Sequence, residues 1–119
     1  MRILVCGSRA WTDELIIMRE LAQFARAFGV EVVIEGGASG ADAIGKRAAT
    51  KLDIPVLTFP ADWKRHGRAA GPIRNKQMLD EGKPDQVLAF WDGRSRGTNN
   101  MIEISRSAGI PVKVVRQEE

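Results

Sequence analysis

Cysteine, histidine and aromatic residues are scarce in this sequence. A lone cysteine, Cys6, cannot form an internal disulfide bond. A lone histidine, His66, without paired cysteines or spaced carboxylates gives no pattern typical of a metal site, so we expect neither a metal nor a cofactor. Tyrosine is absent and aromatic residues make up 6% of the chain, which disfavours the aromatic stripe on which single-strand-binding proteins stack bases.

Long apolar runs are missing as well. The longest, residues 30–34 and 87–91, fall far short of the roughly 20 residues that a membrane span needs. The apolar start of the chain is interrupted by Gly7 and is too short for a signal peptide. Together with the single thiol, these features predict a cytoplasmic protein without a membrane partner.

No block of one charge sign occurs either. The chain has 18 basic and 15 acidic residues and a net charge of +3. Its densest basic cluster, residues 64–68, is equally consistent with binding a small anion. The mild basicity therefore permits nucleic-acid binding without favouring it.

Short β-branched runs alternate with helical stretches along the 119 residues, which we interpret as one domain spanning residues 1–119. We expect strands at residues 2–6, 30–35, 55–59, 86–91 and 111–115. We expect helices at residues 12–28, 41–52, 73–81 and 98–108, with a long loop at 61–72. This alternation predicts an α/β fold, a Rossmann-like doubly wound parallel sheet of five strands in the order 3-2-1-4-5 with four helices.

Open sheets of this kind bind ligands outside the carboxyl ends of their strands, near the switch in strand order. Glycines gather in the loops that follow the first, second and fourth predicted strands: Gly7, Gly36, Gly37, Gly40, Gly93 and Gly97. Gly40 and Gly97 open helices whose N–H groups attract phosphate, and Ser39 and Thr98 add hydroxyl groups there. Each loop alone is equally consistent with a helix cap or a tight turn, but three converging loops favour a phosphate site.

Charged and aromatic side chains follow the same strand ends. The candidate phosphate-binding cations are Arg9, Arg68 and Arg74. The candidate acceptors for ribose hydroxyls or a base are Asp42, Asp62 and Asp92. The alternative roles are turn formation or partnership with a helix dipole for the carboxylates, and solvated surface charge for the arginines. Trp63 is a candidate for stacking on a base, whereas a strand-end tryptophan such as Trp91 more commonly packs in the core.

Two nucleotide-binding motifs are absent or incomplete. The residues that begin at Gly7 do not spell G-x-G-x-x-G, so an ordinary dinucleotide site is not indicated. Residues 40–46 spell G-x-x-x-x-G-K, but Arg47 follows where serine or threonine is required, and these residues lie inside a predicted helix. A P-loop is therefore excluded.

Five short motifs occur in order, at residues 7–11, 36–42, 60–63, 67–78 and 97–98. Together they closely resemble the YspA-like, cpYpsA-related branch of the SLOG superfamily, which is named for the DNA-processing SMF/DprA proteins and the lonely-guy enzymes. Many members occur in phages or mobile elements of bacteria. The resemblance implies a Rossmann-like sheet, a site for nucleotides or nucleotide-derived ligands that includes Ser8 and Asn75, and a homo-oligomer.

The lonely-guy enzymes are phosphoribohydrolases with the signature P-G-G-x-G-T-x-x-E and a helix start of the type R-K-x-x-M. The present chain keeps Gly97, Thr98, Arg74 and Met78 of these patterns, whereas Met101 stands where the catalytic glutamate belongs. The resemblance therefore implies phosphate binding without the usual catalytic carboxylate. The candidates for a relocated catalytic group are Asp42, Asp62, Asp92 and Arg74.

Three functions follow from these observations. The chain is a binding module that senses or sequesters a nucleotide-type small molecule, a hydrolase that cleaves an N-glycosidic or phosphate bond of such a ligand, or a DprA-like module that binds single-stranded DNA. Met101 disfavours the second, and the mild charge with few aromatics disfavours the third. We therefore expect binding of nucleoside monophosphates without release of free base.

Overall fold

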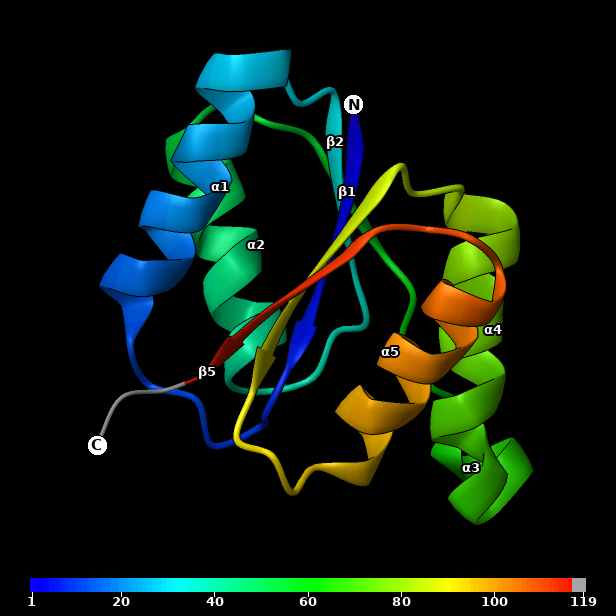
Figure 1. The fold of residues 1–119 in the computed structure, drawn as a ribbon. Helices are drawn as coiled ribbons and strands as arrows, with labels where there is room; N and C mark the ends of the chain where they lie inside the picture. The colour runs from blue at the N-terminus through cyan, green and yellow to red at the C-terminus, as the bar shows by residue number, and fades with distance from the viewer. Residues whose placement is uncertain (117–119) are drawn as a thin grey trace.

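The computed structural model describes residues 1–116 and contains a five-stranded sheet whose strands all run parallel (Figure 1). The strands are β1 (Arg2–Gly7), β2 (Val32–Glu35), β3 (Val56–Thr58), β4 (Gln86–Trp91) and β5 (Val112–Arg116). Their order is β3-β2-β1-β4-β5, which confirms the predicted fold class and strand order. In this register Leu4 of β1 pairs with Ile34 of β2 and Val87 of β4.

Helices cover both faces of the sheet. They are α1 (Glu14–Phe28), α2 (Ala41–Lys51), α3 (Trp63–His66), α4 (Ala70–Gly82) and α5 (Arg96–Ser107), with a 3-10 turn η1 (Gly67–Ala69). Figure 1 shows α1 and α2 together on one face and α4 and α5 together on the other. The four long helices match the four predicted ones, and the short α3 is additional.

The central strand β1 supplies side chains to both layers, because successive side chains of a strand point to opposite faces. Ile3 and Val5 pack with buried residues of α1 and α2. Leu4 and Cys6 pack with buried residues of α4 and α5, among them Met101. Both faces of β1 are therefore buried, which explains why its sequence is a continuous apolar run rather than an alternating one.

The loop predicted at residues 61–72 is wrong over most of its length. Asp62 begins α3, because its carboxylate accepts a hydrogen bond from the Arg65 N–H at 3.1 Å. After η1, α4 begins at Ala70, earlier than the predicted start. Pro72 does not delay this start, since the N–H that proline lacks has no helical partner in the first turn anyway. All other elements begin and end within two residues of the predicted ranges.

No helix formed by residues 1–116 is long and apolar enough to cross a membrane. The single domain, the cytoplasmic location and the homo-oligomer that the sequence suggests stay predictions. The two edges of the sheet are β3 and β5, and β1 and β4 are neighbouring inner strands that pair with each other. The loops that follow the central pair are therefore adjacent in space, and the candidate site lies among them.

Candidate functional site

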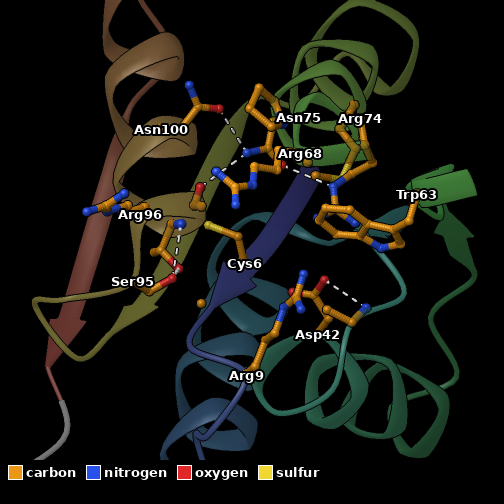
Figure 2. A pocket seen from close by; sticks show the side chains of 17 residues that line it. Cys6, Arg9, Asp42, Trp63, Arg68, Arg74, Asn75, Ser95, Arg96 and Asn100 are labelled. Carbon is orange, nitrogen blue, oxygen red and sulfur yellow. Dashed lines mark hydrogen bonds between the residues drawn. The ribbon is translucent and has the colours of Figure 1, made fainter. Parts of the chain in front are cut away.

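A pocket of about 400 Å³ opens where β1 and β4 end, which is the switch point of the strand order (Figure 2). Cys6 and Gly7, at the end of β1, form its floor. The starts of α4 and α5 line one side, and Arg9 and Asp42 line the other. We call this pocket the first cavity. Its position is the one at which open parallel sheets bind ligands.

The start of α5 forms one wall of the first cavity. The helix begins at Arg96, and Ser95 caps it by accepting hydrogen bonds from the Thr98 N–H at 3.3 Å and the Thr98 hydroxyl at 3.0 Å. Helix geometry leaves the N–H groups of Arg96 and Gly97 without an intrahelical partner. Because these groups and the helix dipole favour negative charge, this wall is suited to a phosphate.

Asn75 fixes this wall relative to α4. Its side-chain Nδ2 donates to the carbonyl of Gly97 at 3.1 Å and to Asn100 Oδ1 at 3.0 Å. Its Oδ1 accepts from Arg74 Nε at 3.1 Å. The amide of Asn75 is therefore engaged by the protein itself, and it positions the start of α5 and the Arg74 guanidinium (Figure 2).

Asp42 is a buried carboxylate on the opposite wall. Its Oδ2 accepts hydrogen bonds from the N–H groups of Gly36 at 3.1 Å and Ala38 at 3.3 Å. Burial raises the pKa of Asp42 to about 6, although these hydrogen bonds and the nearby Arg74 guanidinium limit the rise. Arg74 in turn donates to the carbonyl of Gly36. At neutral pH this wall therefore holds a carboxylate that is easily protonated beside a partly buried cation.

Asp42→Asn is expected to remove a pH dependence of stability. The pKa of about 6 lies above the ordinary 3.8, so the folded state keeps a proton that the unfolded state has released. The contribution of Asp42 to stability therefore falls as the pH rises from about 4 to 6, by an amount on the order of 3 kcal/mol at full effect. Urea unfolding at several pH values would measure this fall. The same fall in the variant would show that another group causes it.

The loop that follows β2 uses its backbone N–H groups in hydrogen bonds to two carboxylates of the protein. Glu35, which is buried, accepts from the Gly37 N–H at 2.6 Å and from the Thr58 hydroxyl at 3.2 Å. With the two hydrogen bonds to Asp42, these contacts occupy the N–H groups of residues 36–38. This glycine-rich loop therefore does not present them to a phosphate, contrary to the simplest interpretation of its sequence.

The cations that the sequence singles out gather around the first cavity, together with one more. They are Arg9, Arg68, Arg74 and Arg96. The guanidinium carbon of Arg9 lies 5.2 Å from the ring centroid of Trp63, which places a cation over the ring face at the rim. Among residues 1–116, Asp42 is the one residue with a carboxylate that lines the first cavity. The charge of the pocket is therefore predominantly positive.

The structure brings most of the predicted ligand-binding residues together. From the first half of the chain, the first cavity is lined by Gly7, Arg9, Asp42 and Trp63. From the second half, it is lined by Arg68, Arg74, Asn75, Gly97 and Thr98. A second cavity of about 290 Å³ shares the wall formed by Arg9, Ala38, Trp63 and Arg74. The remaining wall of this second cavity is formed by Gly36, Gly37, Ser39, Pro60 and Ala61.

The other two candidate carboxylates form local turns outside both cavities. Asp62 caps α3. Asp92 accepts hydrogen bonds from the N–H groups of Ser95 and Arg94, both at 2.8 Å, and from the Ser8 hydroxyl at 3.2 Å. These hydrogen bonds, led by that of Ser95, lower the pKa of Asp92. Neither carboxylate is placed to act on a ligand in the pocket, so Asp42 is the carboxylate on which a catalytic role rests.

Two of the predicted ligand-binding glycines also lie outside the cavities. A Cβ on Gly40 would collide with the carbonyl groups of Ser8 and Arg9. A Cβ on Gly93 would collide with the guanidinium of Arg116. Gly40 allows two backbone segments to approach each other, whereas at Gly93 the arginine side chain can move and the backbone φ of +82° is what favours glycine. Ser8, which is buried and donates its hydroxyl hydrogen to Asp92, lines neither cavity.

Four polar or reactive wall residues escaped prediction: Cys6, Ser95, Arg96 and Asn100. Cys6 lies within an apolar strand and gives no local signal, and burial raises the pKa of its thiol. A cap at Ser95 was readable in principle, because serine begins many helices. No group of three or more His, Cys, Asp or Glu side chains in residues 1–116 is placed to hold a metal ion.

Comparison with known proteins identifies the family. The chain is 39% identical to the gene 61 protein of Mycobacterium phage D29 over 118 residues, which covers 93% of each chain. The model of the YspA, cpYpsA-related SLOG family matches residues 1–66. This chain belongs to that family. The resemblance predicted from the five motifs is thereby confirmed.

The SLOG fold of the chain also matches a solved structure. DNA processing protein A (DprA) from Streptococcus pneumoniae superposes with a TM-score of 0.77 over 98% of this chain. The chain spans half the length of DprA, and the two are 18% identical, so the likeness shows a shared fold. The SLOG family match covers β1 to α3, whereas the walls contributed by α4 and α5 lie beyond it.

Proposed function

We propose that this SLOG protein binds a phosphate-bearing nucleotide or nucleotide-derived small molecule in the first cavity. The observation that carries the proposal is the charge of the wall. Among residues 1–116, four guanidinium groups, one carboxylate and the start of α5 line this pocket. A volume of about 400 Å³ falls within the range of small-molecule sites.

The chemistry of the wall suggests how such a ligand lies. Arg68, Arg96 and the first turn of α5 suit the phosphate, since guanidinium groups and free N–H groups both donate to its oxygens. Trp63, with 48% of its surface exposed at the rim, offers an aromatic face beside the sugar or base. Asp42 lies on the opposite wall, where a carboxylate accepts from a ribose hydroxyl.

Arg96→Ala is expected to weaken the binding of nucleoside 5′-monophosphates by at least about tenfold, because it removes a charge-assisted hydrogen bond. Arg94→Ala is the matched control, since Arg94 is an exposed arginine two residues earlier that does not line the cavity. Calorimetric titration at low, fixed salt measures both, with nucleosides as the phosphate-free comparison. Equal losses in the two variants would indicate surface charge alone, and no binding by the unaltered protein would refute the proposal.

Asp42 favours hydrolysis as a second candidate function. A buried carboxylate with a pKa of about 6 is poised to donate a proton to a leaving group near neutral pH. Glycoside hydrolysis, however, generally uses two carboxylates, and residues 1–116 place one on this wall. The unaltered protein would be shown to be an enzyme if it released free base from a nucleoside monophosphate and Asp42→Asn lost this activity. The binding-module proposal would then give way to hydrolysis.

The fold shared with DprA is the observation behind the third candidate, binding of single-stranded DNA. Proteins that bind single-stranded DNA stack successive bases on several aromatic side chains. The wall of the first cavity offers one exposed ring, Trp63. A short oligonucleotide that bound more tightly than every mononucleotide would favour DNA as the partner.

A further inference from the structure

The second cavity continues the first one past Arg9 and Trp63. The start of α5, Arg68 and Arg96 line the first cavity and do not line the second. A nucleotide whose phosphate lies at α5 therefore extends its base toward the second cavity. There Pro60, Ala61 and the Trp63 ring provide an apolar surface for a flat base.

The second cavity is lined by positively charged hydrogen-bond donors and by no carboxylate of residues 1–116. Its charged groups are the guanidinium donors of Arg9 and Arg74. The nearby carboxylates of Glu35 and Asp42 do not line it, and both accept hydrogen bonds from backbone N–H groups of the loop between them. Charged donors are thus present while charged acceptors are shielded.

Arg9 is the donor best placed to read a base. Arg74 already donates to the Gly36 carbonyl and to Asn75 Oδ1. The guanidinium of Arg9 instead lies over the Trp63 ring face, on the wall that both cavities share. A guanidinium stacked on a ring keeps its N–H edge available for two parallel hydrogen bonds.

A forked pair of donors matches an edge with two adjacent acceptors. Guanine and hypoxanthine present O6 and N7 in this arrangement, whereas adenine presents an amino donor beside N7. We propose that the ligand is a 6-oxopurine nucleotide, with its base in the second cavity and its O6 and N7 facing Arg9. This inference rests on the proposed function and assigns the base that the same site selects.

The test compares GMP, IMP and AMP by calorimetric titration of the whole protein. GMP and IMP are each expected to bind at least about tenfold more tightly than AMP. IMP lacks the 2-amino group of guanine, so its agreement with GMP would exclude that group as the source of the selectivity, and the loss of the preference in Arg9→Gln would assign it to the O6 and N7 edge. Equal affinities for all three would overturn the inference and leave the proposed function standing, whereas no binding of any of them would overturn both.

Arg9→Gln is expected to shift the preference toward AMP by at least about tenfold, because a glutamine amide pairs with the amino group and N7 of adenine. Arg68→Gln is the matched control, since Arg68 is an exposed arginine on the first cavity alone, and it should weaken all three ligands alike. Ala61→Phe, which fills the second cavity, should bring the three affinities together. A preference for GMP that survived both Arg9→Gln and Ala61→Phe would overturn the assignment.

Discussion

Gly97→Val is expected to abolish nucleotide binding, by at least about a hundredfold, in a protein that remains folded. Apart from its chain neighbours and the nearby backbone of its own helix, a Cβ on Gly97 would meet no atom within 4 Å, so the valine side chain enters open space on the pocket wall. That space is where we expect phosphate oxygens, so the side chain and the phosphate exclude each other. The loss combines the helix N–H contacts with those of the neighbouring arginines.

The fold should tolerate this change. Gly97 lies in the first turn of α5 at a backbone conformation open to other residues, and valine costs no more than glycine in a helix. Thermal unfolding without ligand should therefore match the unaltered protein, while titration with GMP shows no binding. Asn99→Val, which places the same side chain two residues further on and outside the cavity, is the control. Unchanged affinity in folded Gly97→Val would mean that the start of α5 holds no phosphate.

Met101→Glu is expected to destabilise the fold by more than about 3 kcal/mol at neutral pH. Met101 is fully buried among Leu4, Cys6 and other side chains between the sheet and the α4–α5 layer. A carboxylate there loses its hydration among apolar side chains, which is among the most costly changes a core can receive. Placing at residue 101 the glutamate that the lonely-guy enzymes carry at the matching position is therefore not expected to restore catalysis in this chain.

The pH dependence of this loss distinguishes burial from other causes. Burial would raise the pKa of the introduced glutamate, so the destabilisation should shrink as the pH falls and the group binds a proton. Met101→Leu, which nearly conserves volume, should cost less than about 1.5 kcal/mol. Urea unfolding of both variants at several pH values gives the comparison. Near-normal stability of Met101→Glu at neutral pH would show that its side chain reaches the pocket and would revive the question of glycosidic cleavage.

The parallel sheet could be predicted from the sequence because its strands are apolar on both faces and are separated by segments with clear helical periodicity. The right-handed crossover rule then favoured a doubly wound sheet, for which 3-2-1-4-5 is a common strand order. The short α3 was missed because a four-residue helix has no periodicity to detect, and its cap, Asp62, resembled a ligand contact. Pro72 suggested a helix start after it, although a first turn accepts proline as readily as the preceding loop does.

The site was predictable in location and less so in its contacts. The strand-end rule brought Arg9, Arg74 and Gly97 to one pocket. The sequence did not reveal that the loop N–H groups after β2 are used by Glu35 and Asp42, because a buried carboxylate and a ligand phosphate require the same donors. Contacts of this kind depend on which groups meet in the folded structure. Composition and motif spacing do not predict these partners.

The first cavity lies between the two helical layers, and its opposite walls come from different layers. Arg9 and Asp42 belong with α1 and α2, whereas Arg68 and Arg96 belong with α4 and α5. A nucleotide bound as proposed would therefore contact both layers at once. Any partial opening that separates the layers must first release the ligand, so its free energy rises with ligand concentration. Ligand binding would thus increase the protection of the loops at this end of the sheet from hydrogen exchange.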